Sequence, residues 1–241
     1  LEALESLQPG MRYPIGKHLL DDEILAVRIE AGRVLADTAA DSLDATQRAR
    51  LQKVIDEYIA ALLYNAEHPQ TYINLGNLYV RMGDAGEAEQ AYRQLLLLDD
   101  RYVPAYINLA DLFRLTGREQ EALNTLRQGL EVAPENAGLH HAYGLALVRG
   151  QQLPRAVMAL QRAAELQADN ARYSYVYAVA LDASGETGQA IEVLERYHES
   201  AAGNDMDILA ALASYTRKAG DMEKAGQYEQ QLMELREMQA N

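Results

Sequence analysis

Apolar residues in most of the chain recur three or four positions apart, the spacing of one face of an α-helix. Between Asp44 and His68 this pattern is unbroken and uses Leu51, Val54, Ile55, Tyr58, Ala61 and Leu62. Asp44 is a favourable N-cap for such a helix. Glycine (16) and proline (6) are few, whereas good helix formers abound. The pattern predicts an all-α chain.

A second period, of 34 residues, is superimposed on the helical one. TYINLGNLYVRMGDAGEAEQAYRQLLLLDD from Thr71 aligns at that offset with AYINLADLFRLTGREQEALNTLRQGLEVAP from Ala105. Small residues recur at Gly76, Ala110, Gly144 and Ala178, and again at Ala88, Ala122, Ala156 and Ala190. We expect these positions where two helices cross, since small side chains let backbones approach to roughly 8–10 Å. Turn glycines recur too, with Gln151 in place of one of them.

This pattern resembles the tetratricopeptide-repeat (TPR) family over about the last 170 residues. The resemblance implies a right-handed superhelical α-solenoid of TPR helix pairs, in which stacked repeats bury a continuous core. Five repeats are expected, the last shifted by one residue: 69–102, 103–136, 137–170, 171–204 and 206–239.

The first 68 residues do not continue the repeat. Residues 1–42, with HLLDDEILAVRIEAGRVLAD, resemble a HEAT helical pair, and residues 43–68 are expected to form a linking or capping helix. A HEAT-like pair followed by such repeats is similar to the C-terminal part of certain bacterial multihaem c-type cytochrome proteins, on LLDDEILAVRIEAGRVLAD, YINLGNLY and ARYSYVYAVALDASG. That resemblance implies the periplasm; the residues themselves leave the compartment open, with the cytoplasm as the alternative. No CxxCH motif is present, so no haem site is carried over.

The amino-acid composition and the charge disfavour several classes of partner and activity. A net charge of −14 disfavours nucleic acid and anionic membranes as partners, although the charge is equally explained by solubility alone. The chain has no cysteine, no apolar run long enough to cross a bilayer and no recognisable catalytic motif. We therefore expect no enzyme activity, no cofactor and no metal. Because the chain begins with Leu1, we expect it to be part of a longer product.

In TPR arrays the first helix of each pair lines the concave groove, which suggests where a peptide would bind. The expected groove residues are Asn74, Asn77, Arg81, Asn108, Asp111, Arg114, His141, Arg149 and Tyr175. Asn74 and Asn108 stand one period apart and resemble the asparagine ladder with which some TPR proteins hold a peptide backbone. The alternative is that these amides bond only a neighbouring turn or water.

Other groove positions also allow two interpretations. Arg81, Arg114 and Arg149 would form a basic stripe for an acidic partner segment, or else pair with nearby acids such as Asp111, which we favour. Tyr175 would be an aromatic anchor or ordinary packing. Asn77 and Asn108 match two positions of the clamp that holds chaperone tails, but its basic positions are not basic here, so that partner is rejected.

The last helix carries an apolar face with Tyr228, Leu232 and Leu235. Solenoid ends usually need a polar capping helix. The sequence therefore predicts that this face packs in a homodimer or against a partner.

Three functions compete. The first is a protein-interaction scaffold that binds a peptide or protein segment in the groove. The second is a regulatory or substrate-docking region of a larger enzyme, such as a multihaem cytochrome or a transferase, whose catalytic part lies outside this chain. The third is a structural spacer without a groove ligand.

Overall fold

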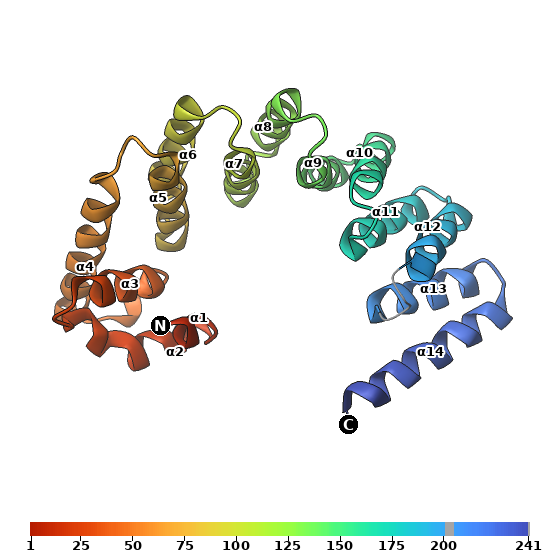
Figure 1. Ribbon diagram of the computed structural model, residues 1–241, viewed down its shortest axis with the longest axis horizontal. Helices are drawn as coiled ribbons and strands as arrows, with labels where there is room; N and C mark the ends of the chain where they lie inside the picture. The colour runs from red at the N-terminus through yellow and green to blue at the C-terminus, as the bar shows by residue number, and fades with distance from the viewer. Residues whose placement is uncertain (201–204, 241) are drawn as a thin grey trace. The chain divides into compact units, whose positions relative to one another are not determined.

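The computed structural model describes residues 1–200 and 205–240. Within these residues every regular element is helical and no strand occurs, which confirms the predicted all-α array of paired helices. The chain divides into two compact units, Leu1–Arg118 and Glu119–Asn241. Figure 1 labels the helices of both units.

Unit 1 begins with short elements and continues into longer helices. These are α1 (Glu2–Glu5), α2 (Pro9–Gly16), the 3-10 helices η1 (Lys17–Asp21) and η2 (Ala40–Ser42), α3 (Leu25–Leu35), α4 (Ala45–Leu63), α5 (Pro69–Met82), α6 (Ala85–Leu98) and α7 (Val103–Leu115). Helix α3 packs on α4, and α5 packs on α6. The assignment of residues 1–42 to a HEAT-like pair stays a prediction.

Helix α4 starts where the sequence predicts. Asp44 accepts a hydrogen bond from the backbone N–H of Gln47 (2.8 Å), and the backbone N–H of Asp44 donates to the Gln47 side chain (3.0 Å). This reciprocal pair satisfies two donors that the first helical turn leaves free. Leu51, Val54 and Ile55 then face the buried core of the N-terminal region.

The crossing of α5 and α6 depends on a missing side chain. A Cβ on Gly76 would lie 2.5 Å from Cδ1 of Tyr92, a buried residue of α6. The predicted role of small residues at helix crossings is confirmed here, and again at Gly144 in unit 2, where a Cβ would lie 2.6 Å from Cγ of Leu160. The two helices of each pair therefore pack closely at these glycines, where a larger side chain would collide with the partner helix.

Unit 2 consists of α8 (Glu119–Val132), α9 (Ala137–Arg149), α10 (Leu153–Leu166), α11 (Ala171–Ala183), α12 (Thr187–Ser200), α13 (Met206–Lys218) and α14 (Met222–Ala240). Its core includes Ala178 and Ala190, the small residues of the 34-residue period, packed with Leu181, Leu194 and Ile208. Gln151, which replaces a turn glycine, has a φ of 56°. That left-handed conformation is unfavourable for a side chain, which explains why glycine occupies the matching turns.

Candidate functional site

Three asparagines of unit 1 lie on two successive first helices, Asn74 and Asn77 on α5 and Asn108 on α7, and we name these three residues the amide cluster. The Nδ2 of Asn108 donates to Oδ1 of Asn77 at 3.0 Å, so the amides of two successive first helices are joined directly. Asn74 lies one helical turn before Asn77 on the same face of α5. The structure therefore joins Asn108 to Asn77, whereas the Asn74 side chain accepts a hydrogen bond from Gln70, and the two-rung ladder of Asn74 and Asn108 stays a prediction.

Tyr92 fixes the orientation of the amide cluster. Its hydroxyl donates to Oδ1 of Asn77 at 2.7 Å, and burial raises the pKa of Tyr92 to about 12. The phenol therefore stays a neutral donor at any physiological pH. With Oδ1 of Asn77 accepting two hydrogen bonds, its amide N–H groups keep their donor capacity for another acceptor, such as a peptide carbonyl.

A hollow of about 370 Å³ lies beside Asn74. It is lined by Ala61, Leu62, Asn65, His68, Gln70, Thr71 and Asn74. Gln70, one turn before Asn74, donates to Oδ1 of Asn74 at 3.1 Å. This bond leaves the Asn74 amide nitrogen as a donor at the edge of the hollow. Sequence reasoning missed Gln70, although its spacing of four residues from Asn74 on a helix could have revealed it.

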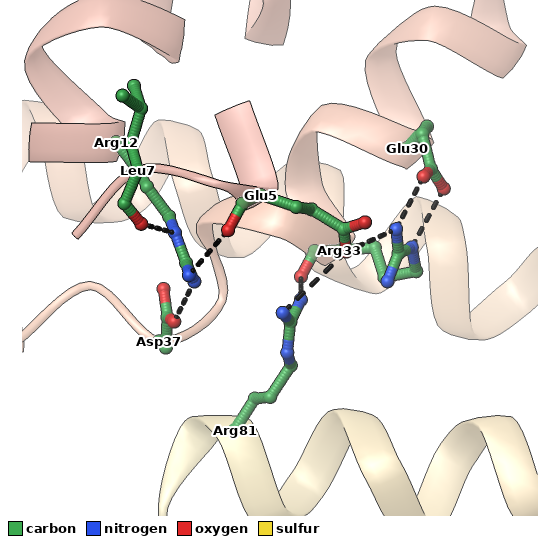
Figure 2. A network of polar contacts seen from close by, with 7 residues as sticks. All are labelled: Glu5, Leu7, Arg12, Glu30, Arg33, Asp37 and Arg81. Atoms are coloured by element: carbon green, nitrogen blue, oxygen red, sulfur yellow. Dashed lines mark hydrogen bonds and ion pairs between the residues drawn. The ribbon is translucent and has the colours of Figure 1, made fainter. Parts of the chain in front are cut away.

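Arg81, expected in the groove, instead holds the N-terminal segment of its own unit. Its Nη1 donates to the carbonyl oxygen of Arg33 at 2.9 Å, and its Nη2 lies 3.7 Å from Oε1 of Glu5. The same Glu5 carboxylate bonds the Arg33 guanidinium at 2.7 Å. Figure 2 shows Glu5 between the two arginines, with Glu30 on the far side of Arg33. Nothing in the sequence pattern pointed to Glu5.

Arg12, which lies on α2 within the N-terminal segment, also bonds this segment to the residues after α3. Its guanidinium pairs with Asp37 and donates to the backbone carbonyls of Leu7 (3.0 Å) and Glu5 (3.0 Å), as Figure 2 also shows. We name the network of Glu5, Arg12, Arg33, Asp37 and Arg81 the N-terminal clasp. It ties α1 and α2 to α3 and to the end of α5.

Replacing Glu5 with glutamine is expected to loosen the N-terminal clasp. The ion pairs of Glu5 are partly exposed, so we expect a loss of less than about 1 kcal/mol in global stability. The main effect should be faster hydrogen exchange in α2, measured by mass spectrometry, because Arg33 and Arg81 lose their shared carboxylate. The control Glu23→Gln changes an exposed acid outside the clasp and should leave exchange in α2 unaltered. Equal exchange in both variants would contradict the role assigned to Glu5.

The other two arginines of the expected basic stripe also have acidic partners, which agrees with the interpretation favoured from the sequence. Nε of Arg114 lies 3.2 Å from Oδ1 of Asp111, and Nε of Arg149 lies 3.4 Å from Oε1 of Glu119. Both pairs are exposed enough to exchange for an incoming acid. They add little to stability and leave the amide cluster as the stronger binding feature.

Besides Arg149, the expected groove residues of unit 2 are His141 and Tyr175, and these two differ sharply in exposure. His141 on α9 is only 7% exposed, packs its ring 4.7 Å from that of Tyr173, and neither ring nitrogen has a hydrogen-bond partner among the described residues. It is a core residue and presents nothing to a ligand. Tyr175 on α11 is 36% exposed and lies one turn before the exposed Val179, so that face of α11 does offer an aromatic contact.

The C-terminal face is largely covered by its own chain. Leu232 is 9% exposed, and the hydroxyl of Tyr228 donates to Oε1 of Glu195 on α12 at 2.9 Å. Leu235 is half-buried. Among the side chains of α14 that the structure describes, the large apolar ones that are exposed are methionines: Met222, Met233 and Met238. The homodimer through this helix stays a prediction, and two of its three named residues already have contacts within unit 2.

The described residues hold no group of three or more histidine, cysteine or acidic side chains arranged to bind a metal ion. None of the described helices combines the length and apolar character that a bilayer crossing requires.

Two models of the tetratricopeptide repeat match the sequence, one over residues 69–102 and the other over residues 99–237. The longer match covers more than half of the chain, and the chain therefore belongs to the tetratricopeptide-repeat family. Among curated proteins, no sequence match was found.

Solved structures share the fold. A crystal structure of MamA aligns with a TM-score of 0.60 and 23% identity, covering 69% of this chain and 96% of that one. A MamA fragment from Desulfovibrio magneticus RS-1 gives a TM-score of 0.60 and 17% identity over 72% of this chain and 97% of that one. YrrB is described as a TPR protein with an unusual peptide-binding site. Its structure aligns with a TM-score of 0.57 and 23% identity, covering 73% of this chain and 90% of that one. At these identities the likeness establishes the fold alone.

Proposed function

We propose that this chain is a protein-interaction scaffold whose amide cluster binds the backbone of an extended peptide or protein segment. The observation that carries the proposal is the direct bond between Asn108 and Asn77, oriented by the Tyr92 hydroxyl. A row of amides with free donors matches the alternating carbonyl and N–H groups of an extended chain. A binding surface already fixed in place also loses less entropy when a ligand binds.

Two further features support this function. The hollow beside Asn74 is lined by both apolar and polar side chains, as expected of a pocket for a peptide side chain. YrrB, which shares the fold, has a peptide-binding site according to its description. The charge of −14 favours a neutral or basic segment over an acidic one as the partner.

The test is a peptide-display selection on the parent protein, followed by affinity measurements on two double variants. Asn74→Ala with Asn108→Ala removes two amides from the binding face. Since one net hydrogen bond contributes about 1 kcal/mol, we expect selected peptides to bind tenfold or more weakly. The control, Gln90→Ala with Gln128→Ala, removes two exposed amides from the second helices α6 and α8 and should leave affinity unchanged.

Three results would count against the proposal: no enriched peptide, equal loss in both double variants, or loss of helicity in the asparagine variant that explains the weaker binding. Circular dichroism of each variant separates the last case. A selected peptide whose affinity depends on Asn74 and Asn108 at full helicity supports it.

The alternative role as a docking region of a larger enzyme uses the same amide cluster. In that case the segment bound by Asn74 and Asn108 would come from the catalytic part or its substrate. Loss of turnover by the longer natural product in the asparagine variant, with turnover kept in the glutamine control, would favour docking over a free scaffold.

A further inference from the structure

Unit 2 contains a cavity of about 540 Å³ between helices α10 and α12, with α11 as its floor. We name it the tyrosine cavity. Its lining includes Gln161, Ala164 and Glu165 on α10, Ala168 in the turn after α10, Tyr177 on α11, and Glu192, Val193, Arg196 and Tyr197 on α12. Figure 1 shows these three helices next to one another in the order of the chain.

The geometry of the helix pairs produces this opening. Both α10 and α12 pack on α11, which separates them from each other. Residues 161, 164 and 165 lie on one face of α10, which forms a wall, and residue 168 follows in the turn after the helix. Ala164 and Ala168 have small side chains, which leave space that Tyr177 and Tyr197 do not fill. The amide cluster belongs to unit 1, so the tyrosine cavity is a different site.

Acidic groups dominate the surroundings of the tyrosine cavity. Burial raises the pKa of Tyr177, and the nearby carboxylates of Glu165 and Glu186 raise it further, whereas the charge of Arg196 lowers it. Burial likewise raises the pKa of Tyr197, with added contributions from Asp205 and Asp169. Burial is the largest cause of both shifts, and among the charges that act on the two phenols four carboxylates stand against the one guanidinium of Arg196.

The rim itself carries two acids and one base. Glu165 is held by Gln161 (2.9 Å) and Arg162 (3.4 Å), whereas Glu192 is exposed and makes no ion pair with the described residues. Arg196 is the base of the rim, and it too is exposed and unpaired within the described part of the chain. Its guanidinium can therefore turn toward solvent without breaking a bond.

We infer that the tyrosine cavity binds a basic segment of a partner protein, with an arginine or lysine side chain entering beside Tyr177 and Tyr197. Aromatic faces attract a cation, and carboxylates at the rim neutralise its charge. The volume exceeds what one side chain fills, so residues flanking the cation also enter. The two alanines and Val193 supply apolar contact for them and for the aliphatic part of the basic side chain.

The test uses two short labelled peptides with the same alanine–serine background, one with a central arginine and one with citrulline, its neutral isostere. Amide chemical shifts of the full chain are followed by NMR during titration. The arginine peptide should shift resonances of α10, α11 and α12, and the citrulline peptide should bind at least about fivefold more weakly. Equal binding of both peptides would overturn the inference, because no cation would then be needed.

Variants that change single charges test whether the arginine peptide binds at the rim of the tyrosine cavity. Glu192→Lys should weaken the arginine peptide by about fivefold, and Arg196→Gln should strengthen it about threefold, since a competing cation leaves the rim. The control Glu131→Lys makes the same charge change at an exposed position of α8 outside the cavity and should have a much smaller effect. If Glu131→Lys and Glu192→Lys weaken binding equally, the peptide senses only the overall charge and the inference is wrong.

The test also separates this site from the amide cluster. The variant Asn74→Ala with Asn108→Ala should bind the arginine peptide as the parent does. If the peptide instead shifts resonances of α5 and α7, or loses affinity in that variant, the binding belongs to unit 1 and the inference about the tyrosine cavity is overturned.

Discussion

Replacing Gly76 with alanine is expected to destabilise unit 1 by about 2–3 kcal/mol, although alanine is the better helix former by about 1 kcal/mol. The added methyl group would lie 2.5 Å from Cδ1 and 2.7 Å from Cζ of the Tyr92 ring. That ring is buried, and its hydroxyl bonds Asn77. Helices α5 and α6 must therefore separate or the ring must move, and either change disturbs the amide cluster.

The matched control is Gly86→Ala on α6. A Cβ there has only the Asp84 carboxylate within 4 Å, at 3.7 Å, so alanine should be neutral or stabilise by up to about 1 kcal/mol. Native-state hydrogen exchange of α5 and α6 measures both variants locally, because an array of repeats need not unfold in one step. Equal stability of the two variants would show that the crossing tolerates a larger residue. The Gly76 variant should also bind selected peptides more weakly.

Acidification is expected to destabilise unit 2 through His141. Burial, and secondarily the charge of Arg172, lower the pKa of His141 to about 4, against 6.5 in a model peptide. Below pH 6.5 the unfolded chain therefore binds a proton that the folded chain does not, and stability falls with pH until about 4. Between pH 7 and pH 5 this single group should remove about 2 kcal/mol.

The measurement compares the parent with His141→Leu, which removes the titrating ring and its two unpartnered nitrogens. Urea unfolding at pH 7 and pH 5 gives the change in free energy for each protein, and the parent should lose about 2 kcal/mol more than the variant. Comparing the two cancels the contributions of the many carboxylates. His140→Gln, which changes the neighbouring and less buried histidine, should keep the acid sensitivity of the parent. Parallel pH dependence in parent and His141→Leu would disprove the assignment.

Much of the local structure follows from the sequence. The capping pair at Asp44 and Gln47, the small residues Gly76 and Gly144 at helix crossings, and the turn glycines all act between residues close along the chain. Helical spacing and a fixed period describe such contacts completely, because the partner of each residue lies at a known offset. The all-α class of paired helices rests on these positions.

The candidate site follows from the sequence only in part. The repeat register put Asn74, Asn77 and Asn108 on the first helices, but the bond between Asn77 and Asn108 and the hydroxyl of Tyr92 beneath it depend on how neighbouring pairs stack. The repeat register also predicted that His141 lies on the groove face of its helix, yet the ring of Tyr173 from the next helix pair covers it. The 34-residue period predicts on which face of its own helix a side chain lies. It does not predict how far the residues of the neighbouring helix pair bury that side chain.

Contacts between distant segments were decided by the tertiary structure alone. Glu5 meets Arg81 because the first helices fold back along α3 to the end of α5, and no spacing in the sequence links those positions. Tyr228 turns inward because Glu195 on α12 accepts its hydrogen bond. The sequence by itself determined the helices, their pairing and the family, since these depend on local periodicity. The partners of individual charged and aromatic side chains depend on which surfaces meet in three dimensions, and only the folded chain sets those.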